Sequence, residues 1–396
     1  MRRLRIEGAR VWDGISDRTS DAPVSVDVTG DRVESLGRAA ASNPSAQVLQ
    51  CEPGSVLIPG LIDSHVHLCL DPKLRTPDEQ RALPRETVRA AVQSRAEQML
   101  RAGITTLRDL GGGDGFEIEL RDRINRGELL GPRILCAGQP LTSVGGHCHF
   151  WGGEADGPEQ FRSVIERQVA AGVDWIKVMA TGGLYTRGTR ASTAQFDREE
   201  LSLACGIASQ HGRPVATHCH GTEGIRNSTA AGVRTIEHCS FAGSEGFGSD
   251  FQPELCAQIA AAGIWVSPTI NAGWGRFRAR ESDSRFFRAM SRVLAQLLQA
   301  GVSLVASTDA GIPNVQHGDL ARALLEMQAF TAQTPLQVLR SATRVAAQAL
   351  QLEHETGSLV PGLSADLVVL PGDPLEDLEF LQRPSCVVMR GDPVSL

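Results

Sequence analysis

Short apolar segments alternate with longer segments of helical periodicity through the middle of the chain. The apolar segments predict eight β-strands, at residues 56–68, 104–110, 133–138, 174–180, 214–220, 234–240, 264–269 and 302–308. Helical patterns lie between most of them, at 84–102, 158–172, 197–211, 221–232, 252–263 and 282–300, and two more follow, at 317–330 and 335–351. Eight strands joined by crossover helices predict an α/β fold, a (β/α)8 barrel of the TIM type.

The two ends of the chain have a different pattern, with short alternating segments that Gly, Asp and Pro interrupt. Residues 1–55 share this texture with two segments near the other end, 364–373 and 384–392. We therefore expect residues 1–55 and 358–396 to pair into one small composite β-domain. The barrel would then occupy residues 56–357.

Composition narrows the classes of partner. The net charge of −7 and the pI near 5.8 argue against nucleic acid or an anionic membrane surface. No apolar run is long enough to span a bilayer, and no apolar segment of a signal peptide follows the first arginines. The nine cysteines form no CxxC pair, which argues against a disulfide framework or a structural zinc site. We expect a cytoplasmic protein, and the sequence leaves open whether it forms a homo-oligomer.

Metal-competent side chains stand where four of the predicted strands end. His65 and His67 close the first strand, and residues two apart face the same side of a strand. The fifth strand ends in His218-Cys-His220, the sixth in Glu237-His238 and the eighth in Thr308-Asp309. Any one of these residues has an ordinary explanation as a hydrogen-bonded strand end. Four of them at the carboxyl face of a barrel, where barrel enzymes place their sites, favour a metal centre.

Lys177 lies inside an apolar predicted strand, Asp-Trp-Ile-Lys-Val-Met-Ala, where a charged amine is costly. The alternative is a buried lysine paired with an acid, a role that arginine often fills. This chain has 37 arginines and only two lysines, Lys73 and Lys177. Arginine keeps its proton, whereas a buried lysine can lose it and react with carbon dioxide to form a carbamate. We interpret Lys177 as a lysine that the chemistry requires.

The order His-x-His, Lys, His, His, Asp resembles the amidohydrolase superfamily, in its binuclear branch with a carboxylated lysine. The segments VLIPGLIDSHVH, TGG, IEH and STDAG support the resemblance, which covers nearly the whole chain. The segment GSLVPGLSADLVVL is similar to the stretch that re-enters the flanking β-sandwich domain in that superfamily. GGHCHFWGG, VATHCHGTEGI and AGVRTIEHCSF look most like the prolidase-like branch, which is related to imidazolonepropionase.

That resemblance implies two divalent metal ions that share a hydroxide. His65, His67 and Asp309 would bind one ion, His218 and His238 the other, and Lys177, carboxylated on its amine, would bridge them. His218 is the better ligand because related sequences often replace the second histidine of this motif, so His220 is expected to face the substrate. Zinc, manganese and cobalt all suit such ligands. Asp309 would also move the proton from the nucleophile to the leaving amine.

The substrate implied by the resemblance is a small molecule with an amide bond, such as a dipeptide or an N-acyl amino acid. His147 and His149 lie in the strand-three motif GGHCHF, and His147 is the preferred hydrogen-bond donor to the developing oxyanion. Tyr185, with Arg187 and Arg190 beside it, would bind a substrate carboxylate. Each of these residues has a plain alternative as part of a loop that only shapes the site.

Three other functions stay open. A mononuclear cyclic-amide hydrolase or deaminase would keep the histidines and the aspartate but lack the bridging lysine, so Lys177 speaks against it. A metal-free scaffold would have lost ligands, and all six are present. Phosphotriester, lactone or xenobiotic amide hydrolysis uses the same pair of metals, because a fold and a metal centre do not fix the substrate.

Overall fold

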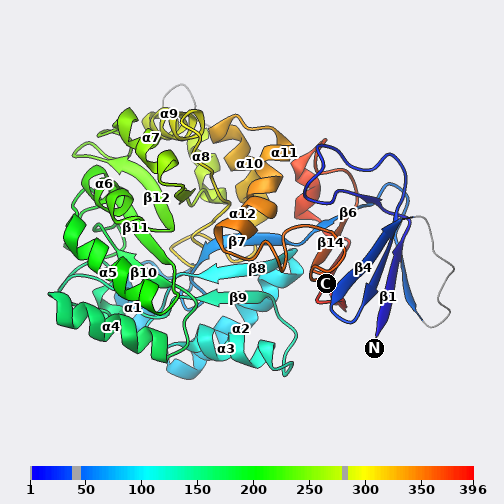
Figure 1. Cartoon of the computed structure of the whole chain (residues 1–396), viewed down its shortest axis with the longest axis horizontal. Helices are drawn as coiled ribbons and strands as arrows, with labels where there is room; N and C mark the ends of the chain where they lie inside the picture. Colours follow the sequence, from blue (N-terminus) through cyan, green and yellow to red (C-terminus); the bar gives the residue numbers. More distant parts are fainter. Residues whose placement is uncertain (1, 38–45, 279–283) are drawn as a thin grey trace.

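A computed structural model describes residues 2–37, 46–278 and 284–396 of the chain (Figure 1). The protein is mixed α/β, with parallel strands in its middle and sheets of mostly antiparallel strands built from both ends. The parallel strands are β7 (Leu61–Val66), β8 (Ile104–Asp109), β9 (Arg133–Cys136), β10 (Ile176–Met179), β11 (Val215–Gly221), β12 (Thr235–Ala242) and β13 (Trp265–Ser267). In the described ranges, no helix is long and apolar enough to cross a membrane.

The parallel strands form two sheets, in the orders β7-β8-β9 and β10-β11-β12-β13. Backbone contacts connect these sheets on both sides. Leu141, which follows β9, pairs in parallel with Val178 of β10. On the other side, the segment 302–310 makes two single parallel bridges. Leu304 pairs with Val266 of β13, and Ala310 pairs with Val66 of β7. The predicted strand 302–308 is therefore an irregular segment between its two neighbours.

Helices follow most of the parallel strands and cover their outer side (Figure 1). Their bounds are α1 (Pro77–Arg81), α2 (Arg85–Arg101), α3 (Phe116–Asn125), α4 (Pro158–Ala170), α5 (Arg198–Gln210), α6 (Thr222–Ala231), α7 (Pro253–Ala261), α8 (Gly275–Arg278), α9 (Arg285–Gln299), α10 (Leu320–Thr331), α11 (Pro335–Ser341) and α12 (Arg344–Ala349). Three short 3-10 helices are η1 (His149–Trp151), η2 (Ala272–Trp274) and η3 (Leu378–Gln382). The sequence did not predict α1 or α3, and the predicted helix 335–351 is broken between α11 and α12. Residues 282 and 283, the predicted start of α9, lie outside the described residues.

The strands from the two ends of the chain lie side by side around a separate apolar core (Figure 1). They are β1 (Arg3–Glu7), β2 (Arg10–Val11), β3 (Ser25–Thr29), β4 (Arg32–Gly37), β5 (Gln47–Gln50), β6 (Val56–Pro59), β14 (Leu367–Leu370), β15 (Cys386–Met389) and β16 (Asp392–Val394). They form two sheets, in the orders β4-β3-β1-β5 and β16-β15-β14-β6-β2. The second of these sheets joins strands from both ends of the chain.

The predicted strand 56–68 is two strands that serve different sheets. β6 pairs antiparallel with β14 of the C-terminal segment, and β7 begins the parallel sheet. Gly60 separates them, and a Cβ at this position would lie 2.0 Å from Oγ1 of Thr105. Only glycine lets the chain pass so close to β8 as it changes sheets.

Candidate metal centre and active site

His65 and His67 stand at the carboxyl end of β7 with both rings buried. Nδ1 of His65 donates to Oε2 of Glu237 at 2.9 Å, and Nδ1 of His67 donates to the carbonyl of Gly111 at 2.8 Å. These bonds fix the proton of each neutral ring on Nδ1, which leaves a lone pair on each Nε2. The two Nε2 atoms face one another at 3.3 Å.

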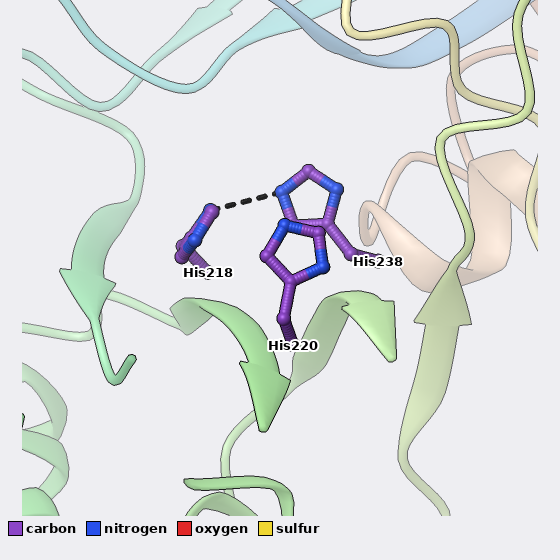
Figure 2. A group of neighbouring side chains, drawn as sticks. All are labelled: His218, His220 and His238. Atoms are coloured by element: carbon purple, nitrogen blue, oxygen red, sulfur yellow. Dashed lines mark hydrogen bonds between the residues drawn. The ribbon is translucent and has the colours of Figure 1, made fainter. Parts of the chain in front are cut away.

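His218 of β11 and His238 of β12 repeat this arrangement with different atoms. Nε2 of His218 donates to the carbonyl of Gly182 at 3.2 Å, and Nδ1 of His238 lies 2.7 Å from the hydroxyl of Thr269. That hydroxyl itself donates to the carbonyl of Pro268, so it accepts from His238. Figure 2 shows the resulting contact, in which Nδ1 of His218 and Nε2 of His238 lie 2.9 Å apart.

Asp309 joins the first pair of histidines from the segment that follows α9. Its Oδ1 lies 3.3 Å from Nε2 of His65 and 3.4 Å from Nε2 of His67. Burial alone would raise its pKa, but His65, His67 and Lys177 lower it to about 2. Asp309 has a φ of 61° and His238 a φ of 67°, in the left-handed region that non-glycine residues seldom occupy. Such backbone strain is concentrated at functional sites, where the surrounding fold holds it.

Lys177 points into the same cluster from β10 and is 1% exposed. Its Nζ has no hydrogen-bond partner among the described residues. Burial lowers the pKa of Lys177 to about 8, although Glu237 and Asp309 raise it. About a tenth of this amine is therefore uncharged at pH 7, far more than for an ordinary lysine, and the uncharged form is the one that reacts with carbon dioxide.

His220, the second histidine of β11, also lies beside His238. Their rings stack at 4.3 Å, and Nδ1 of His220 is hydrogen-bonded to Oγ of Ser240 at 2.9 Å (Figure 2). Two groups of three residues have donor atoms close enough to hold one ion: His218, His220 and His238 in one, and His65, His238 and Asp309 in the other. The geometry admits both histidines of β11 as ligands, so the preference for His218 stays a prediction.

A buried ion pair supports the cluster from behind. Glu237 accepts a hydrogen bond from His65 at Oε2, and at Oε1 it accepts from the hydroxyl of Thr235 and from Nη2 of Arg108, the latter at 2.9 Å. Arg108 is fully buried, and its guanidinium lies 4.4 Å from the ring centre of Trp175. The sequence named Glu237 without a role and missed Arg108. Arg108 could have been found by the pattern that identified Lys177, because it too is a charged residue within an apolar strand.

One cavity of about 530 Å³ opens onto these side chains. Its lining includes all of the candidate ligands, together with His147, Tyr185 and His220. The ring of His147 lies 4.4 Å from that of His218, and burial lowers its pKa to about 3. His149, on η1, and Arg187, which is exposed, are not among the lining residues. Arg190, which is also exposed, is absent from the lining as well, so the structure brings together all but these three of the predicted site residues.

The donor set fits divalent metal ions. Burial lowers the pKa of His65 and His220 to about 4 and holds those of His218 and His238 well below their usual value. The rings are thus neutral at pH 7, and each pair turns two lone pairs toward one another, an arrangement that a shared cation stabilises. The outward nitrogens have the hydrogen-bond partners that orient metal-bound histidines.

A mixed α/β chain with four converging imidazoles, a carboxylate and a buried lysine at one cavity has the features of a metal-dependent hydrolase. The chain belongs to the amidohydrolase family, whose family model matches residues 56–394. It is therefore an enzyme, a hydrolase of that family.

Three comparisons show the range of its relatives. The ochratoxinase of Aspergillus niger is 27% identical over 365 residues, which cover 84% of this chain and 73% of the relative. An imidazolonepropionase of Salinispora arenicola is 23% identical, covering 85% of this chain and 82% of the relative. The crystal structure of a Xaa-Pro dipeptidase with methionine bound in its active site superposes with a TM-score of 0.86 at 26% identity, over 100% of both chains.

Proposed function

We propose that the protein uses two divalent metal ions to hydrolyse an amide bond of a small, peptide-like substrate. The observation that carries the proposal is the buried amine of Lys177, unpartnered among the described residues, beside two pairs of histidines whose lone pairs converge. A mononuclear site would need no lysine there. The relatives named ochratoxinase and Xaa-Pro dipeptidase support amide or peptide bonds as the substrate class.

We also propose that the parallel strands close into a TIM-type barrel over residues 56–357. The bridges at Leu141 and at residues 302–310 support closure. The terminal segments 1–55 and 358–396, with β6 shared in their sheet, would form the β-sandwich beside it. A cytoplasmic location and a homo-oligomer remain predictions from the sequence.

His65, His67 and Asp309 would hold one ion, His218 and His238 the other, and carboxylated Lys177 would contact both. When bound, such ions polarise a carbonyl and lower the pKa of water, with zinc, manganese or cobalt as candidates. Asp309, whose pKa is lowered to about 2, is ionised and can accept the proton of the attacking water. It then delivers this proton to the leaving amine.

We propose that His147 acts on the substrate carbonyl. Its ring lines the cavity beside His218, and Nδ1 has no hydrogen-bond partner within the described residues. A neutral imidazole can donate one hydrogen bond to the oxygen on which charge develops. His220 and Tyr185, which line the same cavity, would contact the substrate.

We expect Gly183→Ala to lower turnover by displacing His147. A Cβ at Gly183 would lie 2.4 Å from both Cε1 and Nε2 of that ring, whose centre is also only 4.4 Å from that of His218. Loss of an oxyanion donor costs about 10²–10³ in kcat, so a displaced donor should cost at least about tenfold. The control is Gly206→Ala in α5, where a Cβ meets nothing within 4 Å. Equal turnover in both variants would remove His147 from the reaction.

Metal analysis tests the proposed function directly. We expect close to two equivalents of zinc, manganese or cobalt per chain in carefully purified protein. The same preparation should release amine from members of a library of dipeptides and N-acyl amino acids, and a chelator should stop the release. The binuclear amidase would be contradicted by one equivalent of metal per chain together with activity on cyclic-amide or deaminase substrates only. That result would favour the mononuclear branch.

A further inference from the structure

A continuous wall of aromatic rings leads from the histidine cluster along the cavity. His220 stacks on Phe247, with ring centres 5.0 Å apart and planes at 18°. Phe247 lies 6.0 Å from Phe286, and Phe286 lies 4.4 Å from Phe277. All of these residues line the cavity. A flat apolar group placed against this wall would extend away from the reacting carbonyl.

The wall ends at a cation. The guanidinium of Arg276 lies 4.6 Å from the ring centre of Phe277 and is exposed at the cavity. Over the described part of the chain, no carboxylate forms an ion pair with it. Its neighbour Arg278, by contrast, makes a two-pronged bond to Glu326, at 2.9 Å for each prong. Of the two arginines of α8, Arg276 is therefore the one that remains available to an outside anion.

The charges around the cavity favour such an anion. Among the described residues of the lining, Asp309 is the one acidic side chain, and it lies at the histidine cluster. A second arginine, Arg75, lines the same cavity. Among the described residues, Arg276 would therefore attract a negative group, whereas the acidic side chain that would repel it lies at the reacting end.

Contacts within the protein hold the wall in place. Trp274 packs edge-on against Phe286 of α9 and Phe330 of α10, with ring centres 4.8 Å apart in both pairs. Glu326 also packs closely against this turn, since a Cβ at Gly275 would lie 2.9 Å from its Oε1. A wall that is already positioned loses little entropy when a ligand binds.

We propose that the substrate is an amide that carries a flat apolar group and, beyond it, an anionic group that Arg276 binds. The inference rests on the proposed function, because it places the scissile carbonyl at the histidine cluster. It moves the anion contact from Arg187, which is exposed and absent from the lining, to an arginine that faces the cavity. It also places the anion at the distal end of the apolar group and not next to the scissile bond.

The first test measures binding to the full, metal-containing protein by calorimetry. The probes are two matched pairs. The first is para-acetamidobenzoate with para-acetamidotoluene, and the second is 4′-acetamidobiphenyl-4-carboxylate with the compound in which a methyl group replaces the carboxylate. We expect the anion of at least one pair to bind about tenfold more tightly than its neutral match, as a charged hydrogen bond provides. The preference should shrink as salt is added. Equal binding of anion and neutral probe in both pairs would overturn the inference.

Variants then locate the anion. Arg276→Gln should erase the preference for the anionic probe and leave binding of the neutral probe unchanged. The control Arg18→Gln, an 80% exposed arginine outside the cavity, should retain the full preference. A preference that survives in Arg276→Gln, or that is lost in Arg187→Gln instead, refutes the assignment. The proposed function fails separately, by a metal count below two or by the absence of any amide cleavage in the wild type.

Discussion

Lys177→Met is expected to lose the bound metal and, with it, at least about 10²-fold of kcat/KM. Changes in residues that only support a metal ligand already cost 10–100-fold, so loss of a bridging group should cost more. Methionine fills a similar volume but offers no amine to carboxylate. Lys177→Arg should also lose the bound metal and the activity, because a guanidinium keeps its proton and cannot become a carbamate.

The same variant should be at least as stable as the wild type when both are free of metal. The amine of Lys177 is 1% exposed and unpartnered among the described residues, and such burial destabilises a protein. An apolar side chain removes that cost, so the melting temperature of metal-free Lys177→Met should equal or exceed that of metal-free wild type. A lysine that served only the fold would give the opposite result.

Lys73 provides the matched control, since it is the other lysine of the chain and is exposed. Lys73→Met should keep its metal and its turnover. Metal analysis, calorimetry and rate measurements on the two variants separate the roles. Two equivalents of metal and wild-type rates in Lys177→Met would refute the bridging carbamate.

The alternation of apolar and helical segments predicted the strand order because each buried strand is a short run bounded by turns. It failed where tertiary contacts override the local pattern. Residues 56–68 form one apolar run, yet the chain changes sheets at Gly60, and only the contact with Thr105 reveals why. Helix α3 was missed because glycines precede and follow it, although Phe116, Leu120 and Ile124 recur with helical spacing.

Spacing also predicted the candidate ligands, since strand ends in a parallel sheet meet at one edge. What it could not predict is which ring nitrogen faces inward, because backbone carbonyls distant in sequence decide this. The carbonyl of Gly111 orients the ring of His67, and the carbonyl of Gly182 orients that of His218. A backbone carbonyl is common to every residue, so the sequence does not reveal these contacts. The wall that ends at Arg276 was equally hidden. It is built from β11, from the segments that follow β12 and β13, and from α9, which lie apart in the sequence. Trp274 and Phe277 line the cavity and also pack against Phe286 of α9.

Asp309→Asn is expected to lower kcat by about 10²–10⁴-fold, the usual contribution of a positioned acid–base group. The amide cannot accept the proton that the carboxylate takes and returns. The fold should survive, because asparagine also tolerates the left-handed backbone that Asp309 adopts at φ 61°. We expect a melting temperature close to that of the wild type, and metal analysis will show whether the amide still helps to hold both ions.

The control for this change is Asp319→Asn. Asp319 stands at the start of α10 and pairs with Arg322, outside the cavity, and asparagine caps helices about as well as aspartate. That variant should turn over at the wild-type rate. The decisive comparison is kcat at full metal occupancy, since a rate loss that extra metal restores would reflect weaker binding. If Asp309→Asn, with two ions bound, cleaves amides as fast as the wild type, the aspartate is a ligand alone and another group must carry the proton.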